Sequence, residues 1–100
     1  MSTYFILTHT VSDLDAFRQS YIPKVFPLLA KHGGEVIVAD FATESLEGEP
    51  AKAAVVIRFP SKQAILDFEN DPEYQPAKKI RHSLTINANA VMANEFKIPS

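Results

Sequence analysis

The sequence predicts a single α+β domain over residues 1–100, in which four antiparallel strands carry helices on one face. Segments rich in branched and aromatic residues, the composition of strands, occur four times along the chain. Helix signals lie between the first and second of these segments and between the third and fourth. Between the second and the third there is a short polar segment, which is typical of a hairpin.

The chain begins with a strand and a long helix. Tyr4 to Val11 has the composition of a strand and no helical period. Ser12 and Asp13 then offer an N-cap, because a short polar side chain can accept a hydrogen bond from the first helical turn. From Leu14 to His32, apolar side chains recur every three or four positions and predict one buried helix face.

Prolines and glycines divide and end this helix. Pro23 and Pro27 each lack a backbone N–H donor, so we expect a kink or a restart near Pro23. Gly33 and Gly34 follow the helix, and glycine is the residue that most readily takes the left-handed conformation found after helix ends.

The middle of the chain predicts a hairpin followed by a short helix. Glu35 to Phe41 is the second strand, and Ala53 to Phe59 is the third. The polar segment from Ala42 to Pro50 connects them. Ser61 caps the next helix. This helix directs three side chains into the core: Ala64, Ile65 and Phe68.

A segment with two prolines precedes the last strand. Asp71 predicts another N-cap, with Pro72 at the first helical position. In a continuous helix Pro76 would clash with the carbonyl group of Pro72. We therefore expect one tight turn from Pro72 to Gln75 and a separate short helix from Pro76 to about His82.

The last strand, Leu84 to Met92, alternates between apolar and polar side chains. Its apolar face is expected to hold Leu84, Ile86, Ala88, Ala90 and Met92. Its polar face is expected to hold Thr85, Asn87 and Asn89. This polar row could line a cavity, but we interpret it as the solvated face of an edge strand.

This order of elements, strand–helix–strand–strand–helix–strand, is the ferredoxin-like arrangement. The first strand is apolar on both sides, with Phe5 and Leu7 on one side and Tyr4 and Ile6 on the other. The helices cover one face of the sheet, so the other face needs a second cover. We expect a homodimer in which two sheets pack face to face.

Composition excludes several classes of function. The net charge is -2 and no basic block occurs, which argues against nucleic acid and against an anionic membrane as partners. The chain has no cysteine, so disulfides, thiolate zinc sites and cysteine nucleophiles are excluded. The N-terminus lacks the features of a signal peptide, and we expect a cytoplasmic protein. No phosphate-binding loop or known catalytic motif occurs, and we expect neither a metal nor a cofactor.

Six parts of the sequence resemble the pattern of a known family, in this order: YFILTHTVSDLDAF, KHGGEVI, LEG, RFPS, DPEYQ and Arg81. The family is DUF1330, a family of domains of unknown function in the dimeric α+β barrel superfamily, and the resemblance covers about Tyr4 to Val91. It implies a ferredoxin-like protomer that dimerises through its sheet. It does not supply a reaction, because the superfamily includes cofactor-free monooxygenases, haem-handling enzymes, lactone isomerases and small-molecule sensors. Phe17 and Glu69 depart from the pattern, which often has tyrosine at the first position and an aromatic residue at the second.

Five polar side chains are candidates for a site in the cleft between the helices and the sheet. The candidate catalytic residues are His32, as a proton shuttle, and Arg81, as the anchor of an anionic group. Tyr21, Arg58 and Tyr74 are the candidate ligand-binding residues. An apolar pocket with a few convergent polar groups is the usual form of a small-molecule site.

Most of these side chains also have a purely structural interpretation. His32 can cap the C-terminus of its helix, where an imidazole favours the helix dipole, and this interpretation is preferred. Tyr21 can be a core residue, and Arg58 can lie at the sheet margin or contact a dimer partner. We interpret His9 as a solvated residue near the end of the first strand.

Two functions therefore stay open. In the first, the chain is a cofactor-free enzyme of the oxygenase or isomerase type that acts on a small organic acid. In the second, it is a non-catalytic dimer that binds a metabolite or a protein. An open pocket lined by the candidate polar groups favours the enzyme, and a packed interior favours the binding module.

Overall fold

The computed structural model describes residues 1–49 and 52–99. In these residues four strands and four helices follow one another. The strands are β1 (Thr3–Val11), β2 (Glu35–Asp40), β3 (Ala53–Phe59) and β4 (Thr85–Asn94). The helices are α1 (Leu14–Ser20), α2 (Ile22–Lys31), α3 (Lys62–Glu69) and α4 (Tyr74–Leu84).

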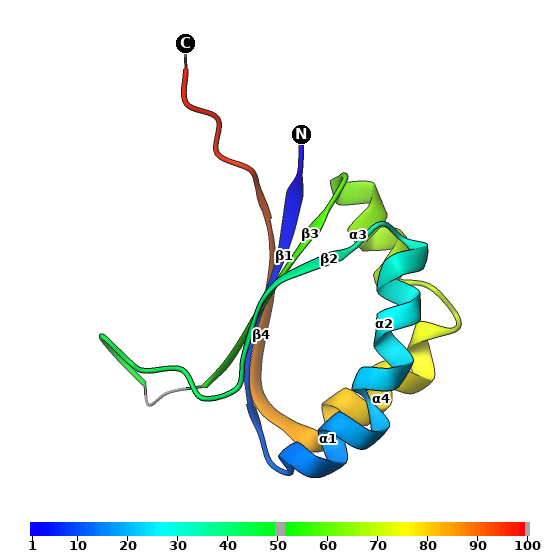
Figure 1. The fold of residues 1–100 in the computed structure, drawn as a ribbon, viewed down its shortest axis with the longest axis vertical. Helices are drawn as coiled ribbons and strands as arrows, with labels where there is room; N and C mark the ends of the chain where they lie inside the picture. The colour runs from blue at the N-terminus through cyan, green and yellow to red at the C-terminus, as the bar shows by residue number, and fades with distance from the viewer. Residues whose placement is uncertain (50–51, 100) are drawn as a thin grey trace.

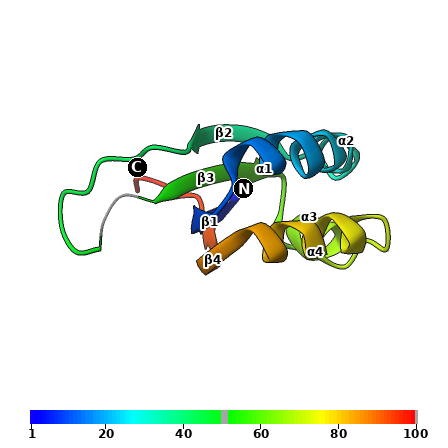
Figure 2. The same cartoon turned by 90° about the horizontal axis from the view of Figure 1, so that it is seen from below.

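Within the described residues, the strands form one antiparallel sheet in the order β2-β3-β1-β4. All four helices lie on the same side of this sheet (Figure 1). Seen from below, α1 and α2 lie toward β2, whereas α3 and α4 lie toward β4 (Figure 2). The arrangement is ferredoxin-like, which confirms the predicted fold class, and β4 is an edge strand as expected.

Local signals set the ends of the first two helices. The side chain of Asp13 accepts a hydrogen bond of 3.0 Å from the backbone N–H of Ala16, as expected of an N-cap. The predicted long helix is divided at Tyr21, two residues before Pro23, so the expected restart near that proline is confirmed. Gly33 follows α2 with a φ of 76°, the left-handed conformation that favours glycine.

The expected break at Pro76 is wrong. α4 is one continuous helix, and Pro76 is its third residue. A proline in the first turn leaves a helix intact, because the N–H groups of that turn have no partner within the helix. The carbonyl group of Pro72, with which a clash was expected, lies before the helix begins. Asp71 does hold the start of this segment, since its side chain accepts a hydrogen bond of 2.9 Å from the backbone N–H of Glu73.

The strict alternation expected for the last strand is also wrong. Asn87 has a φ of 54°, and the register of β4 against β1 shifts at this point. Thr8 pairs with Asn89 and Thr10 pairs with Ile86, so the apolar Ile86 shares a face with Asn89. A bulge at Asn87 therefore moves the first residues of β4 to the opposite faces from those that the sequence predicted.

The core lies between the helices and the side of the sheet that faces them. In β1, every second residue from Thr3 to His9 is buried, and the residues between are half-buried. Leu29 of α2 and Phe68 of α3 pack in this layer. Gly34 lies so close to it that a Cβ atom there would stand 3.0 Å from the ring of Phe59, and a larger residue would not fit without movement.

The other side of the sheet, called the open face below, is not covered by a helix of the described residues (Figure 1). Ile6 of β1, paired with Val56 of β3 and Val91 of β4, lies at its centre. The β2–β3 connection projects away from the helices (Figure 1), and its expected last residue, Pro50, lies outside the described residues. In the part of the chain that the structure describes, the helices are too short or too polar to span a bilayer.

Candidate functional site

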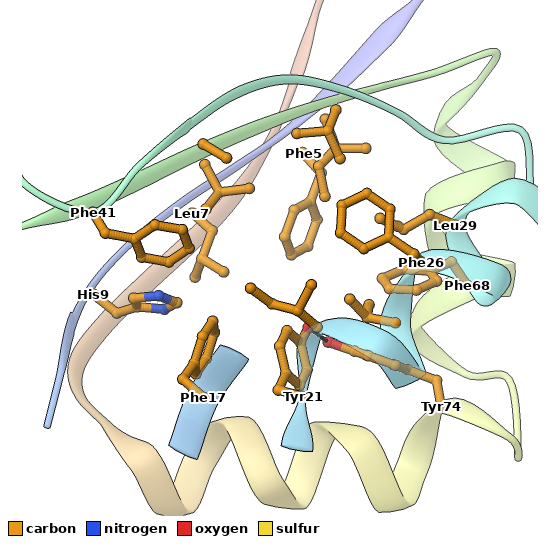
Figure 3. A pocket seen from close by; sticks show the side chains of 16 residues that line it. Phe5, Leu7, His9, Phe17, Tyr21, Phe26, Leu29, Phe41, Phe68 and Tyr74 are labelled. Carbon is orange, nitrogen blue, oxygen red and sulfur yellow. Dashed lines mark hydrogen bonds between the residues drawn. The ribbon is translucent and has the colours of Figure 1, made fainter. Parts of the chain in front are cut away.

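A cavity of about 100 Å³ lies between α1 and α2 on one side and β1, β2 and β3 on the other. Aromatic side chains dominate its walls, and we call it the aromatic cavity (Figure 3). Its lining consists of Phe5, Leu7, His9, Phe17, Tyr21, Ile22, Val25, Phe26, Leu29, Val36, Ala39, Phe41, Val55, Ile57, Phe68 and Tyr74. Three of these side chains carry polar atoms, and the rest are apolar.

The alternation of β1 places His9 at the wall of this cavity. Phe5, Leu7 and His9 share the side of the strand that faces the helices, since side chains point to opposite faces in turn. His9 is fully buried, with an exposed fraction of 0%, so its interpretation as a solvated residue at a strand end is wrong. Its ring packs edge-on against Phe17 at a centroid distance of 5.7 Å.

Neither ring nitrogen of His9 has a hydrogen-bond partner among the described residues. Burial, followed by the positive charge of Arg81, lowers the pKa of His9 from 6.5 to about 4. The imidazole is therefore uncharged at neutral pH and offers one N–H donor and one acceptor nitrogen. Most buried polar groups in proteins have a partner, so His9 is an unusual group in an apolar wall.

Tyr21 and Tyr74 form the second polar element of the cavity. Their hydroxyl oxygens lie 2.8 Å apart, and either hydroxyl can donate (Figure 3). Burial and then the neighbouring Tyr74 raise the pKa of Tyr21 above its usual value, so its phenol stays protonated. Tyr74, one of the candidate ligand-binding residues, is 1% exposed and lies within the wall. The structure thus brings together two of the five residues that the sequence suggested.

His32 lies outside the aromatic cavity and belongs to a small charged cluster. Its Nε2 atom stands 2.7 Å from Oδ2 of Asp71, and Nζ of Lys31 stands 2.8 Å from the same oxygen. Hydrogen bonds from Lys31, His32 and the backbone N–H of Glu73 hold the pKa of Asp71 below its usual range. This cluster joins the end of α2 to the start of the α4 segment.

Arg58 also lies outside the cavity, on the open face. It points the same way as Tyr4, its partner in β1, and its Nη2 atom contacts Oε2 of Glu35 at 2.6 Å. Both partners of this ion pair are partly exposed, and such pairs contribute little to stability.

Arg81 is buried on α4 beside the cavity but does not line it. Its charge acts on His9 and Tyr21 through space. The two arginines that the sequence suggested, Arg58 and Arg81, are therefore on opposite sides of the sheet.

His9 is the cavity residue that the sequence analysis did not select. The signal was present, because residues 5, 7 and 9 have the same parity in one strand and the first two are apolar. Phe41 could not be found in this way, since it lies beyond the end of β2 and reaches the cavity from the connection. No group of three or more metal-ligating side chains occurs in residues 1–49 and 52–99.

A four-stranded antiparallel sheet with helices on one face and a cavity between the layers defines a small ferredoxin-like α+β protein. The sequence profile of DUF1330, a domain of unknown function, matches residues 2–95, and the chain belongs to this family. No curated protein sequence matches the chain significantly.

Solved structures share the fold at low sequence identity. A protein of unknown function from Rhodopseudomonas palustris is 16% identical, with a TM-score of 0.82 over 97% of this chain and 84% of that one. SnoaB from Streptomyces nogalater, a cofactor-independent oxygenase, is 11% identical, with a TM-score of 0.72 over 97% and 95%. A dimeric protein of unknown function from Bacteroides fragilis is 19% identical, with a TM-score of 0.62 over 95% and 96%. At these identities the similarity establishes the fold and not the activity.

Proposed function

We propose that the aromatic cavity binds a small, uncharged ring compound that carries a hydroxyl group, and that the chain converts it without a cofactor. The observation that carries this proposal is the imidazole of His9, which is buried at the wall of an apolar cavity without a hydrogen-bond partner among the described residues. Such a group is costly to bury unless something else supplies the hydrogen bond. A ligand hydroxyl would supply it.

The size of the cavity sets the size of the ligand. Its volume is about 100 Å³. An engineered apolar cavity of roughly 150 Å³ in another protein holds one benzene molecule. A single aromatic ring therefore fits here after small side-chain movements, for which Phe26 at the exposed margin of the lining has room.

The charge of the lining sets the charge of the ligand. The titratable groups of the wall are His9, Tyr21 and Tyr74; burial keeps His9 neutral at pH 7, and the raised pKa of Tyr21 keeps its phenol protonated there. An anion that entered would lose its hydration without gaining an ionic partner in the wall. The small organic acid expected from the sequence is thus best supported as a neutral weak acid, such as a phenol or an enol.

Cofactor-free oxygenation is the reaction we assign to this ligand. SnoaB has the same fold and works without a cofactor, which supports this choice. Without a cofactor the substrate itself must supply the electrons, so an electron-rich ring is required. In the balanced reaction, a phenol with a free ring C–H group and O₂ give a quinone and water. An isomerisation would start with the loss of a substrate proton and would need no oxygen.

A non-catalytic binding protein is the second candidate, and the weak basicity of His9 favours it. A group with a pKa of about 4 removes protons poorly at pH 7. In this case the cavity would bind and release the same molecule unchanged, with His9 serving as a hydrogen-bonding group only.

We further propose that a second copy of the chain covers the open face. Ile6, Val56 and Val91 form an apolar row on this face, and large apolar patches on a monomer are usually covered by a partner. Leu46 of the β2–β3 connection is 98% exposed, and Phe96 of the C-terminal segment is 83% exposed. Both segments project away from the helices (Figure 1), so both are free to contact the same partner chain. The dimeric relative from Bacteroides fragilis supports this assembly.

Binding of phenol tests the function of the cavity. Calorimetric titration should give saturable binding of phenol to the wild-type protein and weaker binding of benzene. His9→Leu should weaken phenol binding by about tenfold while leaving benzene binding unchanged, because it removes one hydrogen bond and no apolar surface. Gln19→Leu introduces the same side chain at an exposed position of α1 and serves as the matched control.

An oxygen electrode separates the two candidate functions. Oxygen uptake with electron-rich phenols that is lost in His9→Leu would support the oxygenase, and binding without uptake would support the binding protein. If His9→Leu binds phenol as well as the wild type, or if benzene binds more tightly than phenol, the assignment of the cavity is wrong.

A further inference from the structure

A second cleft, of about 350 Å³, lies between α3, α4 and β4 on the other side of Phe5 from the aromatic cavity. Its walls are mostly apolar, and Ile65, Leu66 and Met92 are among them. Three charged side chains, Glu69, Lys78 and Arg81, also line it, and we call it the Arg81 cleft.

Arg81 is a buried cation without a counter-ion in the part of the chain that the structure describes. Its exposed fraction is 4%, and no carboxylate of the described residues lies within 4.0 Å of its guanidinium group. Its side chain makes one hydrogen bond in this part of the chain, 3.3 Å between Nη2 and Nε2 of His82. The buried Nε atom has no partner there. A buried charge is normally paired, because the loss of hydration is otherwise not offset.

The other two charges of the cleft cancel each other. Nζ of Lys78 lies 2.7 Å from Oε2 of Glu69, and both side chains are mostly buried. One positive charge, that of Arg81, is thus left over in the lining. A ligand with a single negative charge would balance the cleft, whereas a dianion such as phosphate would overcompensate it and would also meet the carboxylate of Glu69.

We propose that the Arg81 cleft binds a monocarboxylate with an apolar tail. The carboxylate would accept hydrogen bonds from Nε and Nη of Arg81, whose planar fork fits two carboxylate oxygens. The tail would lie against Ile65, Leu66 and Met92. This site is separate from the aromatic cavity, and the proposal goes beyond the function proposed for that cavity and does not depend on it.

Hexanoate is the probe for this site, with hexan-1-ol as its uncharged match and inorganic phosphate as a dianion. Calorimetry should give saturable binding of hexanoate, about tenfold or more tighter than that of hexan-1-ol, and no binding of phosphate. Arg81→Gln should lower hexanoate affinity to that of hexan-1-ol, whereas Lys62→Gln, which removes a positive charge from the exposed surface of α3, should not change it. In nitrogen-15 spectra, the Nε–H signal of Arg81 is identified as the one that Arg81→Gln lacks. Hexanoate should shift this signal in the wild-type protein.

If Arg81 serves a ligand, Arg81→Gln should unfold at the same temperature as the wild type or higher, because the charge has no counter-ion among the described residues when no ligand is bound. A purely structural role for Arg81 would give a lower unfolding temperature instead. Arg81→Lys keeps the charge without the fork and should bind hexanoate with intermediate affinity, which provides a test even if the glutamine variant does not fold. His9→Leu should bind hexanoate normally, so a failure of the cavity proposal would not affect this one. Equal binding of hexanoate and hexan-1-ol, or an Nε–H signal that does not move, would overturn the proposal.

Discussion

The imidazole of His9 costs free energy in the folded chain, because it loses its hydration and gains no hydrogen bond from the described residues. The seven-residue stretch from Thr3 to His9 contributes four buried side chains, and the last of them is this polar one. A leucine at the same position would pack against Phe17 without that cost. A residue that lowers the stability of the folded chain is typical of a binding site.

The free energy of unfolding should depend on pH through His9. The folded chain binds its proton at about pH 4 and the unfolded chain at about pH 6.5. Between these values the unfolded state holds the proton and the folded state does not, so stability is complete above pH 6.5 and falls as the pH is lowered toward 4. The loss is up to about 3 kcal/mol. Urea denaturation at pH 7 and at pH 4.5 measures it.

His9→Leu is the control for this titration. The variant should be more stable than the wild type at pH 7 by about 1–3 kcal/mol, since it removes an unsatisfied buried group. It should also lose most of the difference between pH 7 and pH 4.5. A variant that keeps the full wild-type pH dependence would assign that dependence to other groups.

The tyrosine pair should behave as one unit. Tyr21→Phe leaves the hydroxyl of Tyr74 buried without its partner, and Tyr74→Phe does the same to Tyr21. Each single change should lower the free energy of unfolding by about 1 kcal/mol. The double variant should lose less than the sum of the two, because no hydroxyl is left unpaired. Urea denaturation of the four proteins gives the coupling, and strictly additive losses would mean that the hydroxyls do not interact.

At the scale of elements, Asp71 connects two helices that are distant in sequence. Its carboxylate contacts Lys31 and His32 at the end of α2, and it also accepts the N–H of Glu73 before α4. The positive charge of Lys31 lies where the negative end of the α2 dipole favours it. Phe68, one turn earlier, packs edge-on against the ring of His32 at 6.2 Å. The imidazole therefore helps to fix how α2 and α3 meet.

Asp71→Asn should lower the unfolding temperature by roughly 5 °C or more at pH 7, since it removes the carboxylate charge that Lys31 and His32 contact. Asp67→Asn, on the exposed side of α3, removes a carboxylate that accepts a hydrogen bond from Gln63 and should have little effect. Because the pKa of Asp71 is lowered on folding, its stabilising effect is present above about pH 4 and is lost as the pH falls further. Thermal melts at pH 7 and pH 3 test both statements, and equal melts of the two variants at pH 7 would contradict them.

The ends of a helix were predictable from the sequence where a contact between residues close in sequence determines them. The caps at Asp13 and Ser61 act over three residues, and both accept the expected backbone hydrogen bond. The error at Pro76 came from the starting point of α4, because a shift of the helix start by two residues changes a proline from disruptive to harmless.

The site was predictable only in part, for a reason of distance along the chain. Tyr21 and Tyr74 are 53 positions apart, and no pattern in the sequence states that their hydroxyls meet. Asp71 and His32 are 39 positions apart, and their contact turned a candidate catalytic residue into a member of an ion cluster. The alternation of β1, in contrast, was sufficient to place His9 inside once Phe5 and Leu7 were taken as buried.

At the scale of the whole molecule, the two faces of the sheet differ in what they contact. The helices cover one face and leave the aromatic cavity and the Arg81 cleft on either side of Phe5. The open face is apolar at its centre, and under the proposed assembly it is the contact between two copies. The dimer contact and the small-molecule sites would then be on opposite sides of a single sheet, except that Val91 of β4 belongs to the open face and also lines the Arg81 cleft.

Ile6→Lys should separate the proposed dimer. The charged side chain would lie at the centre of the open face, where a desolvated charge opposes association but a monomer can keep it hydrated. Sedimentation should give about twice the chain mass of 11.1 kDa for the wild type and the single chain mass for the variant. Gln63→Lys adds the same charge on the exposed side of α3 and should leave the mass unchanged. A wild-type protein that sediments as a single chain at all concentrations would remove the dimer.

The bulge at Asn87 has a consequence for how far association can go. β4 ends the sheet, and the unpaired backbone groups of an edge strand can recruit further strands and begin a filament. At Asn87 the backbone turns to a φ of 54°, which asparagine tolerates better than most residues, and the regular row of donors and acceptors is interrupted. A neighbouring strand could not follow this edge over its whole length. The bulge thus opposes the edge-to-edge association of sheets into a filament. The open face is then the surface through which two copies can associate as a closed dimer.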